Sequence, residues 1–335
     1  MKILVTGGLG YIGSHTVVEL INNKYEVVII DNLSNSELFI LDNIEKITGV
    51  RPIFYNQDLL DFIKTNEIFK KEKINGVIHF AAFKSVPESI KKPLLYYNNN
   101  LLSLINVLKC MQENTVSNIV FSSSCCVYGQ PEKLPVSENT TFKKADSPYA
   151  ESKQISEQII QDFVNSHNTI KSISLRYFNP VGAHESGLIG ELPIGVPDNL
   201  VPYITQTAAG IRKELSVYGN NYNTKDGTAV RDYIHITDLA SAHLKAISRL
   251  LSKKSKSLYE FFNVGNGTGY SVLDVITSFE KVNNLKLNYS FKDRREGDIE
   301  EIYSDVKKSK NILEWESKKT LDEMMSSAWK WQKNL

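Results

Sequence analysis

The chain lacks an excess of charge of either sign. Its 39 Lys and Arg residues face 38 Asp and Glu residues, which gives a formal net charge of +1 at pH 7. No global field therefore attracts nucleic acid or an anionic membrane, and neither is expected as a partner. The sequence also contains no run of 18 apolar residues, and the apolar run at residues 3–5 is too short for a signal peptide. We expect a soluble protein.

Cysteine and histidine are scarce as well. The three cysteines, Cys110, Cys125 and Cys126, are odd in number and form no C-x-x-C pair, which argues against a disulfide framework and a zinc site. None of the six histidines stands at H-E-x-x-H or a similar ligand spacing, so no metal is expected. This cysteine usage fits a reducing compartment, and we predict a cytoplasmic protein.

The 335 residues suffice for one large domain or two coupled domains. Short β-branched runs alternate with helical stretches in the first half, as a parallel sheet covered by helices requires. We predict an α/β fold: a doubly wound parallel-sheet Rossmann domain at residues 1–178 and a smaller α/β substrate domain at residues 179–335, with a return to the first at about 231–264. Strands are expected at 2–6, 26–30, 52–55, 76–80, 118–122 and 172–177, and helices at 12–22, 61–71, 94–113 and 148–166.

A glycine pattern, G-x-x-G-x-x-G, lies between the first expected strand and helix. At Gly7, Gly10 and Gly13 the missing side chains let backbone N–H groups approach a pyrophosphate. Asp31 ends the second strand about 20 residues later, where an acidic residue accepts the ribose hydroxyls and repels a 2′-phosphate. The pattern favours NAD over NADP, although the glycines also fit a tight turn without ligand and Asp31 fits a turn residue or helix cap.

A proton-transfer group follows further along the chain. Tyr149 and Lys153 are four residues apart, which on a helix places both on one face, and the lysine cation is expected to favour the phenolate. Ser147 and Pro148 suit the N-cap and first position of that helix. Ser124 closes a strand at the carboxyl edge of the sheet, where ligands collect. Taken singly, these residues also fit a polar strand exit and an ordinary amphipathic helix; together they indicate redox chemistry on an alcohol.

With these signals in order, the chain resembles the extended short-chain dehydrogenase/reductase superfamily and, within it, the UDP-glucose 4-epimerase family. The matching segments are residues 7–15, 31–33, 77–81, 122–124, 127–129, 176–183, 231–235 and 294–298. The resemblance implies interconversion of UDP-galactose and UDP-glucose through a 4-keto sugar, with tightly bound NAD. It assigns proton transfer to Tyr149, a hydrogen bond on the sugar oxygen to Ser124, and a nicotinamide-ribose contact to Lys153. It also implies a homodimer joined through the helices at 94–113 and 148–166.

The resemblance further implies two sets of contacts. The cofactor contacts are Gly7, Gly10, Tyr11, Ile12, Gly13, Asp31, Asn32, Asn35, Ser36, Asp58, Leu59, Phe80, Ala81, Lys84, Asn99, Ser122, Tyr149, Lys153 and Phe178. The substrate contacts are Ser124, Tyr149, Tyr177, Asn179, Asn199, Leu200, Tyr218, Arg231, Tyr233, Arg295, Asp298 and Ile302. Within these sets the two arginines suit the phosphates, Phe80 and Phe178 also fit plain core positions, and Asp58 and Asn99 also fit helix caps.

Two positions bear on alternative functions. Many epimerases have Ala-Thr where this chain has Cys125 and Cys126, and a thiol is the weaker hydrogen-bond partner. Related 4,6-dehydratases and decarboxylases usually place an acid at position 126, so these functions are disfavoured. A non-catalytic NAD-binding sensor typically loses the tyrosine or lysine that persist here. Ile302 stands where a family tyrosine excludes N-acetyl sugars, so UDP-glucose and UDP-galactose are expected to be preferred, with measurable turnover of UDP-N-acetyl sugars. Ile302 also fits a strand residue that faces the core, and a one-residue slip makes Tyr303 the gate.

Overall fold

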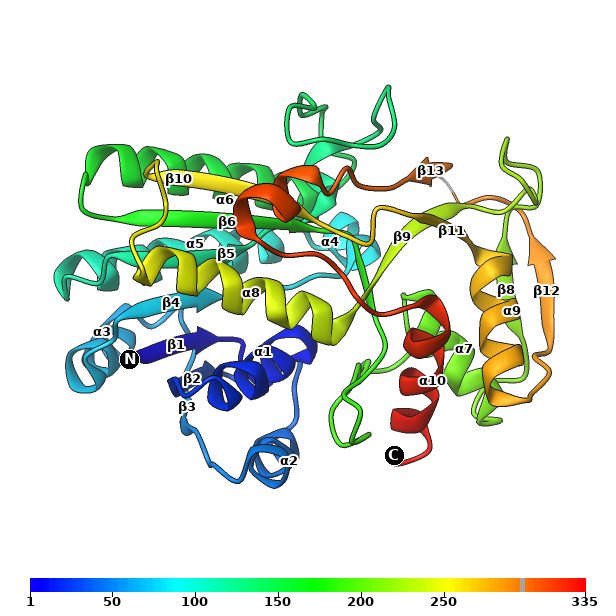
Figure 1. The fold of residues 1–335 in the computed structure, drawn as a ribbon, viewed down its shortest axis with the longest axis horizontal. Coiled ribbons are helices and arrows are strands. Elements are labelled where there is room, and N and C mark those ends of the chain that lie inside the picture. The colour runs from blue at the N-terminus through cyan, green and yellow to red at the C-terminus, as the bar shows by residue number, and fades with distance from the viewer. Residues whose placement is uncertain (296–298) are drawn as a thin grey trace.

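A parallel sheet with helices against both faces dominates the computed structural model, which describes residues 1–295 and 299–335 (Figure 1). The order of its seven strands is β10-β6-β5-β4-β1-β2-β3, and every neighbouring pair is parallel. This order places the carboxyl ends of β1, β4 and β5 side by side. The predicted doubly wound α/β fold is confirmed.

The bounds of the elements follow. The strands of the large sheet are β1 (Lys2–Thr6), β2 (Glu26–Asp31), β3 (Ile53–Asn56), β4 (Gly76–His79), β5 (Asn118–Ser122), β6 (Lys171–Tyr177) and β10 (Tyr259–Val264). The helices before residue 179 are α1 (Tyr11–Asn22), α2 (Phe39–Thr48), α3 (Phe62–Glu72), α4 (Val86–Lys91), α5 (Pro93–Glu113), η1 (Cys125–Tyr128) and α6 (Pro148–Ser166). The strands and helices expected from the sequence agree with these bounds to within one residue at each end, but α2 and α4 were not expected.

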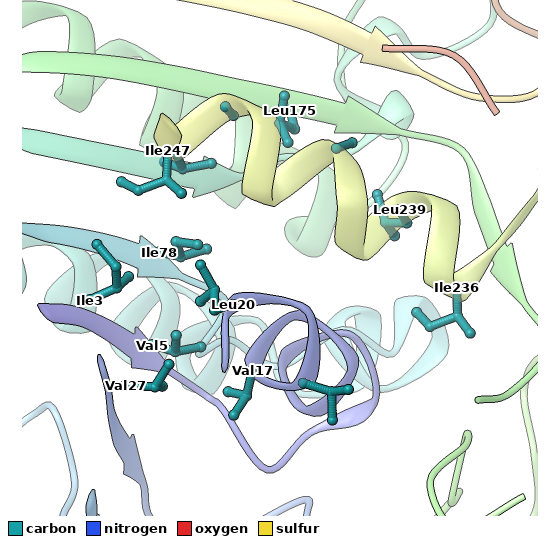
Figure 2. Close-up of a cluster of buried hydrophobic side chains, with 14 of the residues drawn as sticks. Ile3, Val5, Val17, Leu20, Val27, Ile78, Leu175, Ile236, Leu239 and Ile247 are labelled. Atoms are coloured by element: carbon teal, nitrogen blue, oxygen red, sulfur yellow. The ribbon is translucent and has the colours of Figure 1, made fainter. Parts of the chain in front are cut away.

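The strands of the large sheet are buried because both of their faces are covered. On β1, Ile3 and Val5 enter a cluster shared with α1 and α8 (Ile236–Leu251), whereas Leu4 points into a cluster shared with α3, α5 and α6. Figure 2 shows the first cluster, with Leu20 of α1 and Ile247 of α8 against the sheet. Full burial of such a side chain stabilises the fold by about 1.5–3 kcal/mol.

The second half of the chain builds smaller sheets beside the large one (Figure 1). Strand β9 pairs with β7, β11 and β13, and β8 pairs with β12. The remaining bounds are β7 (Asn179–Val181), α7 (Leu200–Ala208), β8 (Leu215–Tyr218), β9 (Val230–His235), β11 (Gly269–Ser271), α9 (Val272–Asn283), β12 (Tyr289–Lys292), β13 (Glu301–Ile302), η2 (Ser309–Leu313) and α10 (Leu321–Gln332).

The chain crosses from the small sheets back to the large one between β9 and α8. Strand β9 belongs to a small sheet, while α8 packs on the large sheet and β10 forms its edge next to β6. The contacts with the large sheet therefore resume at α8, five residues after the start of the return predicted at about 231. Among the described residues, no helix is long and apolar enough to span a membrane.

Candidate active site

The glycine turn after β1 is packed so closely that side chains are excluded at two of its positions. A Cβ on Gly13 would lie 2.1 Å from the carbonyl oxygen of Gly7. Gly7 itself has a positive φ of 68°, and a Cβ there would lie 2.9 Å from the backbone nitrogen of Ala81. Because α1 begins at Tyr11, directly behind the turn, its N-terminal N–H groups and positive dipole end are presented at the carboxyl edge of the sheet.

Asp31 braces this turn from the end of β2. Its Oδ2 accepts a hydrogen bond from Leu9 N at 3.0 Å, and its Oδ1 accepts from Leu33 N at 3.0 Å and from Ser36 Oγ at 2.8 Å. The carboxylate thus lies beside the glycine turn, where a ribose acceptor is expected. Nearby, Asn32 Nδ2 donates to Asp58 Oδ2 at 3.0 Å, which joins two predicted cofactor contacts.

The predicted catalytic residues converge on the end of β5. Ser147 caps α6 by accepting from Ala150 N at 3.2 Å, as predicted, and the helix then presents Tyr149 and Lys153 to the strand exit. The hydroxyl of Ser124 acts on the phenol of Tyr149 and lowers its pKa. Lys153 Nζ donates to the carbonyl oxygen of Ser122 at 2.7 Å.

The electrostatics of this group differ from the expectation that Lys153 draws the phenol towards ionisation. Burial, followed by Cys126 and Tyr177, raises the pKa of Tyr149 well above its usual value, and the bond from Ser124 lowers it. The Nζ of Lys153 lies 5.9 Å from the centre of the tyrosine ring and spends its described hydrogen bond on Ser122. Burial lowers the pKa of Lys153 to about 8.

The two cysteines after Ser124 are thiols rather than thiolates. Burial raises the pKa of Cys126 to about 11 and that of Cys125 further. Cys126 N donates to Ser124 Oγ at 3.3 Å, so the short helix η1 starts by bonding the serine hydroxyl. A protonated thiol is a poor nucleophile, and neither cysteine is placed for covalent catalysis at neutral pH.

Other predicted cofactor contacts line the carboxyl edge. The ring of Phe80 lies 4.7 Å from that of His243, and Asn99 Nδ2 donates to Asn100 Oδ1 at 3.0 Å. Ser122 Oγ and Tyr177 Oη are joined by a hydrogen bond of 2.8 Å. Three further contacts are at most half-exposed: Tyr11 at the start of α1, Ile12 and Leu59. Asn35, which follows β2, is exposed.

Several predicted substrate contacts are brought together by strand pairing. Asn179 on β7 lies opposite Tyr233 on β9, and Arg231 on β9 lies opposite Ile302 on β13. The guanidinium of Arg295 stacks 4.0 Å from the centre of the Tyr218 ring. Asn199 and Leu200 form the start of α7. Asp298 lies outside the described residues.

Ile302 is a core residue in the structure. Its side chain is 3% exposed and packs with Val127, Tyr128, Val136 and Phe178. At position 303, the alternative gate, the ring of Tyr303 lies beside Gly269, where an added Cβ would be 3.3 Å from the ring. The assignment of Ile302 to the sugar pocket stays a prediction.

Sequence reasoning did not find Glu191. Its Oε1 accepts from Lys84 Nζ at 2.9 Å and from Asn199 Nδ2 at 2.7 Å, so one carboxylate joins a predicted cofactor contact to a predicted substrate contact. Alongside it, Ser85 Oγ donates to Asp198 Oδ2 at 2.7 Å. An acidic residue in a Gly- and Pro-rich stretch carries no periodic signal, so only the spatial arrangement identifies it.

The chain is similar to known proteins over nearly its whole length. A family model described as GDP-mannose 4,6 dehydratase matches residues 4–328. The UDP-glucose 4-epimerase of Bacillus subtilis (strain 168) is 49% identical over 332 residues, which cover 99% of this chain and 97% of that protein. The chain belongs to the UDP-glucose 4-epimerase family. The resemblance seen in the motifs is therefore confirmed.

Solved structures of the epimerase family superpose closely on this chain. The enzyme from Stenotrophomonas maltophila, with bound NAD and formylated UDP-arabinopyranose, gives a TM-score of 0.97 at 42% identity over 100% of this chain and 98% of that one. The enzyme from Bifidobacterium longum, in complex with NAD+ and UDP, gives 0.95 at 44% identity over the same shares. Both enzymes thus have the same fold as this chain, in which Ser124, Tyr149 and Lys153 lie together.

Proposed function

We propose that the protein is an NAD-dependent UDP-glucose 4-epimerase that interconverts UDP-galactose and UDP-glucose. The observation that carries this proposal is the convergence of Ser124, Tyr149 and Lys153 on the end of β5, beside a glycine turn braced by Asp31. A nucleotide-sugar hydroxyl placed there meets a proton acceptor and a hydrogen-bond donor at once. The full-length epimerase relatives support the same activity.

The residues present fit NAD. The glycine turn leaves no room for side chains at two positions, and the N-terminus of α1 points at this turn. Asp31 supplies a carboxylate beside the same turn. When bound, NAD supplies the hydride acceptor and donor of the reaction. Lys153 would hold its nicotinamide ribose, and Phe80, Lys84 and the other predicted contacts would hold the rest of the cofactor.

The protein's own part in the reaction is to move one proton and to hold one oxygen. Tyr149 takes the proton from the sugar 4-hydroxyl as that alcohol becomes a ketone, and later returns it when the opposite face of the ketone is reduced. Ser124 bonds the same oxygen throughout. Burial disfavours the phenolate form of Tyr149, and the cation of Lys153, 5.9 Å from the centre of the ring, offsets part of this cost. Arg231 and Arg295 supply planar, multi-donor cations for the two phosphates.

Three further assignments belong to this proposal. The partner is a second copy of the chain, packed through α5 and α6, whose outward residues include Leu94, Leu95 and Leu102 at 80%, 40% and 37% exposure. The division into a cofactor domain at residues 1–178 and a substrate domain at 179–335 assigns UDP to the small sheets. A cytoplasmic location is proposed from the cysteine usage.

The test is incubation of the purified protein with UDP-galactose and no added NAD, followed by sugar analysis. An epimerase yields UDP-glucose, a 4,6-dehydratase yields a 4-keto-6-deoxy sugar, and a non-catalytic binder yields neither. The control is Tyr149→Phe, which keeps the aromatic ring but loses the hydroxyl. Absence of UDP-glucose with the wild-type protein would overturn the proposal.

A further inference from the structure

On α6, the row of side chains that begins with Tyr149 and Lys153 continues beyond Lys153. Glu157 follows four residues after Lys153, as Lys153 follows Tyr149, so all three side chains share one face of the helix. Both Lys153 and Glu157 are buried. A buried carboxylate one turn beyond the catalytic lysine needs partners to remain charged, and the structure supplies them.

These three side chains face three consecutive serines. Lys153 Nζ donates to the carbonyl oxygen of Ser122 at 2.7 Å, and Glu157 Oε1 accepts from Ser123 Oγ at 2.5 Å, while the Ser124 hydroxyl lowers the pKa of the Tyr149 phenol. The strand exit after β5 is therefore hydrogen-bonded to one helix at Ser122 and at Ser123, and Glu157 holds the second of these residues.

Glu157 is held in turn by a buried arginine. Arg176 on β6 donates from Nη2 to Oε2 at 2.5 Å and from Nε to Oε1 at 2.9 Å, and both side chains are 5% exposed. The guanidinium also donates to Tyr128 Oη at 3.0 Å and stacks on the rings of Phe261, at 4.2 Å, and Phe142, at 4.7 Å. The position of Glu157 is thus set by β6, β10 and the loop after η1.

We propose that Glu157 is a positioning residue for the epimerase reaction: through Ser123 it fixes the strand exit that carries Ser124, and through its charge it holds Lys153 as a cation. This inference rests on the proposed function for its kinetic consequences. Glu157 belongs neither to the predicted cofactor contacts nor to the predicted substrate contacts, so it acts through its neighbours.

The charge relation is visible in the groups that surround the lysine. Burial lowers the pKa of Lys153 to about 8, whereas Cys126 and Glu157 act to raise it. From β4, His79 faces the lysine as a neutral ring, because burial lowers its pKa to about 3. The titratable or charged groups around Glu157 itself are Arg176, Tyr128, Tyr259, Cys126 and Lys153.

The direction of the effect follows from the sign of the charges. Removing the carboxylate takes away an anion that raises the pKa of Lys153, and this change disfavours the ammonium form. The pKa of Lys153 then falls. Since the proposed mechanism needs the cation, activity is lost at a lower pH than in the wild-type protein.

The experiment compares Glu157→Gln with a matched control, Glu260→Gln. The control breaks another bidentate pair, between Glu260 on β10 and Arg249 on α8, with bonds of 2.8 and 3.0 Å. The side chains of this pair are 11–12% exposed, and neither is among the groups that shift the pKa of Lys153. For Glu157→Gln we expect the alkaline limb of the kcat/KM profile to move to lower pH, with activity at pH 8.5 about tenfold further below its pH 6.5 value than in the wild type. For Glu260→Gln the limb stays in place.

Two further variants separate folding from positioning. Glu157→Gln combined with Arg176→Met removes both partners of the buried ion pair together, so it serves where the single variant does not fold. Ser123→Ala removes only the hydrogen bond from Ser123 to Glu157. We expect a kcat about 2–10-fold lower, with the alkaline limb of the pH profile unchanged. Wild-type kcat in Ser123→Ala would overturn the positioning role through the strand.

A readout without turnover completes the test. Carbon-13 NMR of lysine Cε follows the ionisation of Lys153, which should titrate near 8 in the wild type and at lower pH in Glu157→Gln or its double variant. An unchanged titration overturns the inference, whatever the activity. An inactive wild-type protein with the expected titration shift contradicts the proposed function instead, and leaves the hold of Glu157 on Lys153 supported.

Discussion

At the scale of single residues, the hydroxyl of Tyr149 carries the proposed proton transfer. Replacing Tyr149 with Phe keeps the aromatic ring and removes the acid/base, so turnover should fall by about 10²–10⁴-fold. The NAD content of the purified variant should match that of the wild type. Turnover is measured with UDP-galactose, and near-normal activity would remove Tyr149 from the mechanism.

Lys153 makes the reaction depend on pH. Burial places its pKa at about 8, below the usual value for lysine, so the ammonium form dominates below that pH and is lost above it. Activity of the wild type should therefore decline as pH rises through about 8. In Lys153→Ala, turnover at pH 7 should be reduced at least as much as in Tyr149→Phe, and this alkaline decline should vanish. A pH–rate profile of unchanged shape in the variant contradicts the assigned role.

At the scale of elements, β13 carries Ile302, the residue predicted to select the sugar. Ile302 is smaller than tyrosine but β-branched and stiff, so UDP-glucose and UDP-galactose should be preferred over UDP-N-acetyl sugars by roughly 10–200-fold, without full exclusion. Ile302→Tyr should increase this preference. The measurement is kcat/KM for UDP-galactose and UDP-N-acetylgalactosamine in both proteins.

The control for Ile302→Tyr must separate crowding of the core from selection of the sugar. Ile302 packs with Val136 in one buried cluster, and overfilling such a cluster costs about 1–3 kcal/mol of stability. Val136→Phe should therefore lower the Tm without changing the substrate ratio. If Ile302→Tyr leaves the ratio at its wild-type value, Ile302 is not the gate.

Helices α5 and α6 give the second prediction at this scale. Leu102 is an exposed leucine on α5, and a homodimer built through this face should dissociate when Leu102 is changed to Glu, because the interface would bury a charge. Light scattering after gel filtration gives the mass. Ile63→Glu on α3, at a side chain that is 70% exposed, is the matched control and should leave the dimer intact. A monomeric wild type contradicts the proposed partner.

At the scale of the whole molecule, two loops meet across the predicted cofactor site. Lys84 and Ser85 bond Glu191 and Asp198, and Tyr11 Oη donates to the carbonyl oxygen of Gly182 at 2.6 Å. Because these contacts must open before a nucleotide leaves, and because the reaction regenerates its oxidant, purified protein should carry NAD(H) and need none added.

Denaturing the protein and assaying the supernatant for nucleotide tests this retention. Glu191→Ala should lower the nucleotide content, since it breaks the contacts to Lys84 and Asn199. Glu260→Gln, which lies outside these loop contacts, should retain it. A nucleotide-free wild type that turns over only with added NADP would contradict the cofactor assignment.

The sequence by itself determined the large sheet and predicted that Ser124, Tyr149 and Lys153 lie together. Strand and helix bounds agreed with expectation to within one residue, because buried β-branched runs and helical spacing are written locally in the chain. The order of glycines, Asp31, Ser124, Tyr149 and Lys153 likewise follows from short spacings. The helices α2 and α4 lack comparably clear patterns and were missed.

Only the tertiary structure decided the contacts between segments far apart in the chain. The buried pair of Glu157 and Arg176, the bridge made by Glu191, and the packing of Ile302 in a core cluster join elements that no periodic pattern relates. The same holds for the ionisation of Tyr149, where burial outweighs the spacing to Lys153. Spacing along a helix fixes which side chains share a face, but desolvation and ion pairing depend on what packs against that face.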